Sequence, residues 1–225
     1  MVECIAHPAL DHYYPRQPVS KPTVPALIPL SLLEAIRNLD TPVEDGLDEL
    51  AEEIVARRLG LSPTVAAQIQ RYRQLADKGG RVDQDETISV FRLVARRPDA
   101  ALVFADAGRR AARHARGKGR SAQTLSRMSP APIARRLGLR NVSRLAAAVF
   151  QGEVRESEGT VELRMPAPLS IAALPQGEAC VFYGSAYQEL LRGLTGFEGA
   201  LLHSACRAQG QDHCLWRTAA AEVYE

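Results

Sequence analysis

The chain has 225 residues and a mass of 24.5 kDa, with 46% hydrophobic and 24% charged residues. These proportions are typical of a globular protein of one large or two small domains, and they exclude a disordered or fibrous chain. No apolar run reaches the roughly 18 residues of a transmembrane helix, and the first thirty residues lack a signal-peptide core. We therefore expect a cytoplasmic protein with no membrane span, whose four cysteines are reduced or metal-bound.

The net charge of +2 conceals an uneven distribution. Residues 106–144 hold eleven Lys or Arg against one acid, Asp106, so this segment carries +10 and the rest of the chain −8. Such a segment can bind nucleic acid, an anionic ligand or an acidic partner, although most charge runs are only a solvated helix face. The candidate anion-binding residues end an expected helix and enter a glycine-containing segment: Arg109, Arg110, Arg113, Arg116, Lys118 and Arg120.

The first half of the chain has the pattern of a helical region behind an extended arm. Residues 1–30 contain six prolines, which fix φ and remove backbone donors, so we expect this arm to be extended. Ser31 is the expected N-cap of the first helix, before Leu32, Leu33 and Ile36. Further helices are expected over residues 43–58, 63–76, 87–96, 98–114 and 130–148.

The last third has a different pattern, which alternates strands with one helix. Short β-like runs over 149–156 and 160–165 are joined by Glu158-Gly159, a hairpin signal. A helix follows over 177–194, and two strands over 197–208 and 213–219 are joined around Gly210. We predict an α+β fold, with a helical N-terminal half followed by a β-β-α-β-β antiparallel-sheet domain. The expected divisions are an arm (1–30), a helical region (31–128) and a ligand-binding domain (129–225).

Three of the four cysteines lie in the last 46 residues: Cys180, Cys206 and Cys214. Cys206 and Cys214 lie four residues on either side of Gly210, so a hairpin turn there would place them opposite each other. Opposed side chains on paired strands have Cβ atoms about 4.5–5.5 Å apart. That separation suits two thiolates on one tetrahedral Zn²⁺, with Zn–S bonds of about 2.3 Å.

The remaining ligands are less directly indicated. Cys180, at the start of the expected helix, can supply a third thiolate. His203 precedes Cys206 by three residues, an odd offset that points to the opposite face of a regular strand. His203 therefore joins the site only if a bulge or a strand start lies between it and Cys206. His213 is the competing ligand, although on a regular strand it and its neighbour Cys214 would face opposite ways. The alternative is a set of buried free cysteines, or a disulfide on oxidation.

The segment from Cys180 to Trp216 resembles the 4-vinyl-reductase-like domain. Its first part, Cys180-Val-Phe-Tyr-Gly-Ser-Ala-Tyr-Gln-Glu-Leu-Leu, is similar to the family's helix of small and aromatic residues. Its second part, His203-Ser-Ala-Cys206-Arg-Ala-Gln-Gly210-Gln-Asp-His-Cys214-Leu-Trp216, is similar to the family's acid-x-x-Cys-x-x-x-Gly-x-x-x-Cys-x-aromatic pattern. His203 stands where the family has Glu, and imidazole is at least as good a zinc ligand. The resemblance covers about residues 142–219.

The resemblance implies a fold similar to TRAPP vesicle-tethering subunits, a homodimer and a structural zinc held by Cys180, His203, Cys206 and Cys214. The family occurs in phenol- and toluene-responsive bacterial regulators and in proteins linked to bacteriochlorophyll synthesis. It therefore implies a module that binds a hydrophobic, aromatic or tetrapyrrole molecule beneath the zinc hairpin and signals to a protein partner. The candidate ligand-binding residues, which could equally be core, are aromatic: Phe150, Phe182, Tyr183, Tyr187 and Trp216.

The sequence carries no recognisable catalytic motif. No Gly-x-Gly-x-x-Gly follows a strand and no nucleophile elbow is present, so we expect a binding protein rather than an enzyme. Four protein ligands leave zinc no open position, which argues against metal-assisted hydrolysis. One alternative is a reductase or substrate-delivery factor in tetrapyrrole synthesis. A second, less favoured because no helix-turn-helix is evident, is a zinc-stabilised nucleic-acid-binding protein that uses residues 106–144.

Overall fold

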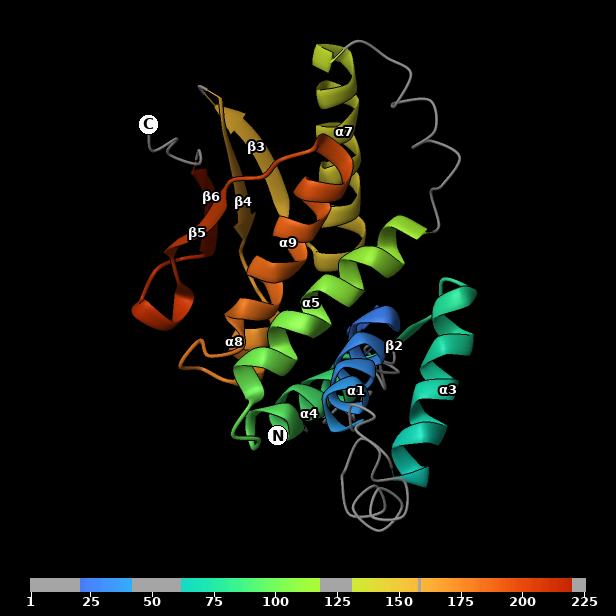
Figure 1. Ribbon diagram of the computed structural model, residues 1–225. Helices are drawn as coiled ribbons and strands as arrows, with labels where there is room; N and C mark the ends of the chain where they lie inside the picture. The colour runs from blue at the N-terminus through green and yellow to red at the C-terminus, as the bar shows by residue number, and fades with distance from the viewer. Residues whose placement is uncertain (1–20, 42–61, 118–130, 158, 220–225) are drawn as a thin grey trace, which may run out of the picture.

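The computed structural model describes residues 21–41, 62–117, 131–157 and 159–219. In these ranges the chain forms seven α-helices, a two-stranded antiparallel sheet and a four-stranded antiparallel sheet (Figure 1). Helices dominate the first half and the larger sheet lies in the last third, so the expected mixture of helices and antiparallel strands is confirmed. None of the helices in these ranges has the length and apolar character needed to cross a membrane.

The helical region begins earlier than the sequence pattern predicted. Strand β1 (Thr23–Pro25) pairs with β2 (Arg81–Asp83), and α1 (Leu27–Asp40) follows β1 almost directly. The prediction that Ser31 caps this helix is wrong, because Ser31 is buried inside α1 and its Oγ donates to the carbonyl of Leu27 at 2.7 Å. Pro29 does not prevent this start, since first-turn N–H groups have no intrahelical acceptor.

The next three helices agree closely with the expected ones. Helix α3 (Pro63–Asp77) begins after Ser62, whose Oγ accepts from the N–H of Val65 at 3.3 Å. Helix α4 (Gln84–Ala95) begins before the expected residue 87, because the Asp83 carboxylate caps its N-terminus. Helix α5 (Ala100–Gly117) carries most of the candidate anion-binding arginines. Residues 1–20 of the arm and the expected helix over 43–58 lie outside the described residues.

The transition from helix to sheet differs from the prediction. Helix α7 (Ala131–Leu145) continues into a π-helical turn, Ala146–Phe150, which ends at Gln151 with a φ of 57°. The expected strand over 149–156 is therefore wrong at its start, because Val149 and Phe150 belong to this turn. Strand β3 (Glu153–Ser157) begins after it and pairs with β4 (Thr160–Met165).

The C-terminal part has the predicted order of elements. A short helix α8 (Leu169–Ala173) precedes α9 (Cys180–Thr195), which is followed by β5 (Ala200–Ala205) and β6 (Cys214–Ala219). The strands form one sheet in the order β3-β4-β6-β5, with every neighbouring pair antiparallel. The β-β-α-β-β arrangement is thus confirmed, with α8 as an addition, while the likeness to TRAPP subunits stays an expectation.

Helix α9 lies between α5 and the inner face of the sheet (Figure 1). On the sheet side, Tyr183 and Tyr187 contact the ring of Trp216 on β6. On the other side, Gly108 of α5 lies against the backbone of α9, where an added Cβ would clash with the carbonyl of Phe182. One continuous core therefore joins the helical region to the C-terminal part, and the expected division at residue 128 stays a prediction.

We expect Gly108→Ala to destabilise the protein by about 1–3 kcal/mol, because the methyl group overpacks the contact between α5 and α9. Gly117→Ala is the matched control at the end of the same helix, where an added Cβ meets nothing within 4 Å. Urea unfolding followed by circular dichroism measures both changes. Equal stabilities of the two variants would contradict the close approach of α5 to α9.

A partly buried carboxylate ties α1 to α3 and α5. Glu34 lies 2.8 Å from Nε2 of His114 and 2.8 Å from Nη2 of Arg73, and its side chain is 11% exposed. Burial by itself raises the pKa of Glu34, but the hydrogen bonds with His114 and Arg73 outweigh it, so that the pKa lies below its usual value of 4.5. A lowered folded-state pKa adds stability above pH 4.5 that is lost as the pH falls through the folded pKa.

Glu34→Gln should therefore reduce stability at pH 7, and the difference from the wild type should shrink as the pH is lowered from about 5 to 3. Glu153→Gln is the control, because Glu153 is an exposed carboxylate paired only with Arg155. The measurement is the midpoint of urea unfolding across this pH range. A gap between wild type and Glu34→Gln that stays constant down to about pH 3 would show that Glu34 does not contribute through its charge.

Candidate metal centre

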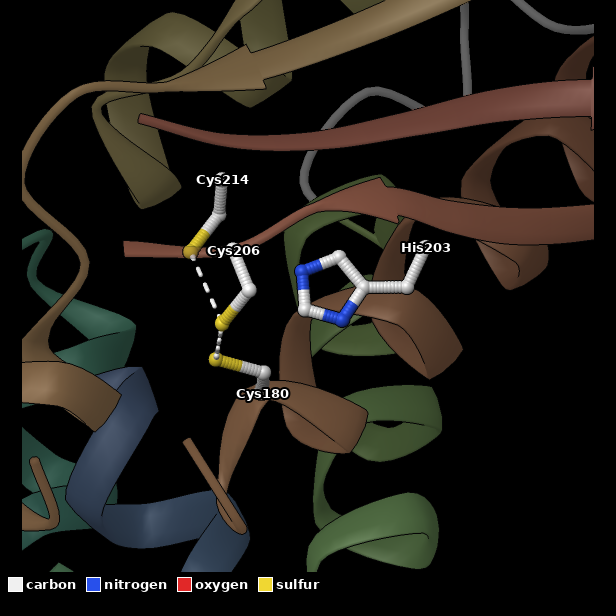
Figure 2. A group of neighbouring side chains, drawn as sticks. All are labelled: Cys180, His203, Cys206 and Cys214. Carbon is white, nitrogen blue, oxygen red and sulfur yellow. Dashed lines mark hydrogen bonds between the residues drawn. The ribbon is translucent and has the colours of Figure 1, made fainter. Parts of the chain in front are cut away.

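Four side chains from three elements converge at one end of the sheet. Cys180 is the first residue of α9, His203 lies in β5, Cys206 directly follows β5, and Cys214 begins β6. Their ligand atoms all lie within 4.8 Å of one another (Figure 2). The Sγ of Cys206 is 4.0 Å from that of Cys180 and 3.9 Å from that of Cys214. Two sulfurs on one tetrahedral Zn²⁺ are about 3.8 Å apart, so the donor set fits this ion.

A β-bulge brings His203 to the same face as the cysteines. His203 pairs with Trp216, whereas Ala205 pairs with Leu215, so Ser204 is an extra residue in β5. The bulge turns the odd offset between His203 and Cys206 into two steps along the ladder, so both side chains lie on the same face, where His203 is exposed and Cys206 is buried. The imidazole also stacks on the Trp216 ring, with centroids 4.6 Å apart and planes 9° from parallel. Trp216 thereby positions His203 toward the thiols.

Two contacts to the thiols were not predicted from the sequence. The hydroxyl of buried Ser170, on α8, lies 3.4 Å from the Sγ of Cys180. The backbone N–H of Arg207 donates to the Sγ of Cys214 at 3.4 Å. The turn between Cys206 and Gly210 is a sequence signal for the second contact, because tight turns present free N–H groups. Nothing in the sequence links Ser170 to Cys180.

The loop before α9 closes tightly over the thiols. Gly177 has a φ of +86°, and a Cβ there would lie 3.2 Å from the Sγ of Cys206 and 2.9 Å from the Cβ of Ala208. Glycine meets both demands, since it adopts positive φ freely and lets the backbone approach the sulfur. The loop therefore covers the thiol of Cys206, while His203 at the other side of the cluster is exposed.

The pKa values of the three thiols are shifted in different directions. The hydrogen bond with Cys180 lowers the pKa of Cys214, and contacts with His203 and the N–H of Arg207 lower it further. The same hydrogen bond with Cys214, together with burial, raises the pKa of Cys180. Burial also raises the pKa of Cys206. These shifts favour loss of the Cys214 proton before those of the other two thiols, and a cation bound by all three sulfurs would displace the remaining protons.

His213 does not belong to the cluster. Its Nδ1 atom is buried and makes no hydrogen bond within the part of the chain that the structure describes. The group of candidate ligands contains His203 instead. Of the two histidines that the sequence left open, the structure therefore places His203 beside the thiols.

The five aromatic candidates for ligand binding form the core between α9 and the sheet. All are at most 2% exposed, and each contacts at least one other ring of the group. The hydroxyl of Tyr183 accepts from the N–H of Leu169 at 3.2 Å, and that of Tyr187 donates to the Sδ of Met165 at 3.7 Å. A role in ligand binding for these rings stays a prediction.

The arginine candidates on α5 are held by acidic residues. Arg110 lies 2.6 Å from Oδ2 of Asp106, and Arg109 and Arg113 each lie 3.9 Å from Oδ1 of the same carboxylate. Arg116 reaches Glu189 on α9, with 3.8 Å between Nη1 and Oε1. Lys118 and Arg120 lie outside the described residues. The described candidates therefore have intramolecular anionic partners.

No protein-family model matches the chain, and neither a curated protein nor a solved structure matches it.

We expect the reduced protein to bind about one Zn²⁺ per chain and Cys206→Ser to abolish this binding. His203→Asn should weaken the affinity about tenfold or more, whereas the matched control His213→Asn should bind as the wild type does. Elemental analysis and competition with a chromophoric chelator measure both. The ligand assignment would be overturned if His203→Asn kept its zinc affinity and His213→Asn lost it. A reduced wild type that bound no metal would exclude the site.

Proposed function

We propose that the chain is a zinc-stabilised binding module of the 4-vinyl-reductase type that takes up a small aromatic molecule. The observation that carries the proposal is the convergence of Cys180, His203, Cys206 and Cys214 within 4.8 Å. These are the positions that the resemblance marks as zinc ligands, and they come from the start of α9 and from the hairpin of β5 and β6. Convergence of this kind is characteristic of a metal site, because isolated buried cysteines need no common centre.

The proposed role of the metal is structural. With one imidazole and three thiolates bound, a tetrahedral Zn²⁺ has no position left for water or substrate. It would join the N-terminus of α9 to the hairpin formed by β5 and β6, since the ligands are divided between these elements. Zinc then contributes to folding rather than to bond cleavage, which favours a binding protein over a hydrolase.

A cavity of about 400 Å³ supports the binding of a small molecule. It lies between α7, the C-terminal end of α9 and the ends of β4 and β6 that are remote from the thiols. This volume is at the lower end of the range for ligand pockets, which favours a compact aromatic molecule over a tetrapyrrole. Its lining is formed by Arg135, Leu139, Gly159, Val161, Leu191, Thr195, Gly196, Phe197, Glu198, Gly199 and Thr218.

Strand β6 links the proposed zinc site to this cavity. Cys214 begins the strand, Trp216 contacts Tyr183 and Tyr187 of α9, and Thr218 lines the cavity. A ligand bound in the cavity would therefore contact β6, the same strand that the metal would hold through Cys214. Transmission to a protein partner, and assembly as a homodimer, are part of the proposal and follow from the family resemblance.

Binding of phenol tests this function. We expect calorimetric titration of the zinc-loaded protein with phenol to give saturable binding, and Leu139→Phe to weaken it about tenfold by filling the cavity. Leu137→Phe is the matched control, because Leu137 is exposed on the same helix and does not line the cavity. Absence of binding to a zinc-loaded wild type would contradict the sensing function and leave the metal centre intact. Equal binding by both variants would place the ligand elsewhere.

A further inference from the structure

Helix α7 presents one face to the protein, and no other described part of the chain covers the opposite face. Its buried side carries Gly138 and Val142, four residues apart, and Gly138 packs against the backbone of Leu194 on α9. In Figure 1 α9 covers this side of α7, which lies at the edge of the molecule. The opposite face is exposed and consists of Ile133, Arg136, Leu137, Arg140 and Arg144. We call these five residues the α7 stripe.

Among the described residues, the arginines of the α7 stripe differ from those of α5 in having no anionic partner. No ion pair or side-chain hydrogen bond joins Arg136, Arg140 or Arg144 to any residue in the described ranges. Helix α7 contains no Asp or Glu, and its other arginine, Arg135, pairs with Glu156 at 2.9 Å. On α5, by contrast, Arg109, Arg110 and Arg113 share Asp106. These three α5 arginines and Asp106 together keep a net charge of +2, whereas all three arginines of the α7 stripe are unpaired among the described residues.

The spacing of these arginines suits a linear polyanion. Arg136, Arg140 and Arg144 follow at intervals of four residues, which on an α-helix is a rise of about 6 Å per step along one face. Their guanidinium groups therefore form a row along the helix axis. Guanidinium is the preferred side chain for phosphate, because its fixed donors match the phosphate oxygens. Successive phosphates of a nucleic-acid strand present such a row of anions.

The composition of the α7 stripe favours a nucleic acid over a lipid surface. A helix that binds in a membrane interface inserts an apolar face along its length. The α7 stripe has two large apolar residues, Ile133 and Leu137, which are 52% and 37% exposed and lie in the first half of the helix. The remainder is arginine and then the small residues Ala147 and Ala148 of the following turn. The cationic component extends from Arg136 to Arg144, whereas the large apolar residues end at Leu137.

We propose that the α7 stripe is a docking surface for the phosphate backbone of a nucleic acid, with Arg136, Arg140 and Arg144 as the contacting residues. Contacts of this type carry no base information, so binding is insensitive to sequence and falls steeply with salt. This surface lies on the side of α7 opposite to α9 and uses none of the proposed zinc ligands.

The test is the binding of the zinc-loaded full chain to a labelled DNA duplex of about 20 base pairs, followed by fluorescence anisotropy over a range of salt concentrations. The triple variant Arg136→Gln, Arg140→Gln, Arg144→Gln should lose about tenfold or more in affinity, and its log–log salt slope should fall by about 3. The control with the same charge change is Arg109→Gln, Arg110→Gln, Arg113→Gln on α5, which should lose clearly less affinity than the α7 variant, because Asp106 already partly neutralises these side chains. Replacing the three α7 arginines by Lys should retain most of the binding, because the charges remain.

Three results would overturn the proposal. One is a wild type that does not bind the duplex at about 50 mM salt. Another is an equal loss in the α5 and α7 variants, which would reflect net charge alone. The third is binding to vesicles rich in phosphatidylserine in preference to the duplex, which would assign the α7 stripe to a membrane. Circular dichroism of each variant checks whether the helices are retained. We expect that they are, because the α7 arginines are exposed.

Discussion

The structure depends on the burial of α9 on two sides. Toward α5 the contact is made through small residues, and Gly108 allows the two backbones to approach each other closely. Toward the sheet the contact is aromatic, with Tyr183 and Tyr187 against Trp216 and with Gly184 leaving room for the indole. A helix held in this way cannot rotate or slide without breaking one of the two contacts. Because Cys180 begins α9, its position relative to the hairpin follows from the same packing.

The part of the candidate metal centre that depends on neighbouring residues in the sequence could be predicted. Cys206 and Cys214 flank Gly210 symmetrically, and a hairpin turn is sufficient to bring them together. His203 is different, because its participation requires the extra residue Ser204, and periodicity cannot show where a bulge occurs. The contact of Ser170 with Cys180 lies further beyond prediction, since it requires α8 to fold back over the start of α9.

The elements that the sequence pattern missed are those in which tertiary packing outweighs local preference. Ser31 is a good N-cap by type, but three apolar residues before it are buried, and their burial extends α1 upstream. Val149 and Phe150 have strand propensity, yet a π-helical turn carries Phe150 into the aromatic core. Strands β1 and β2 have three residues each, which is too short for a period of two to be visible. Ion pairs between distant residues could not be predicted from the sequence pattern either: Arg116 and Glu189 are 73 residues apart.

The bulge in β5 has a further consequence for solubility. Strand β5 is at the edge of its sheet, and its residues Ala-Leu-Leu-His-Ser-Ala contain no charge and no proline. Natural edge strands commonly carry such features because an open, flat edge pairs with other chains. Here the irregularity at Ser204 interrupts the edge, and a metal bound by His203 and Cys206 would hold both sides of that irregularity in place. With a metal bound, these residues would thus also hinder edge-to-edge pairing of β5 with another chain.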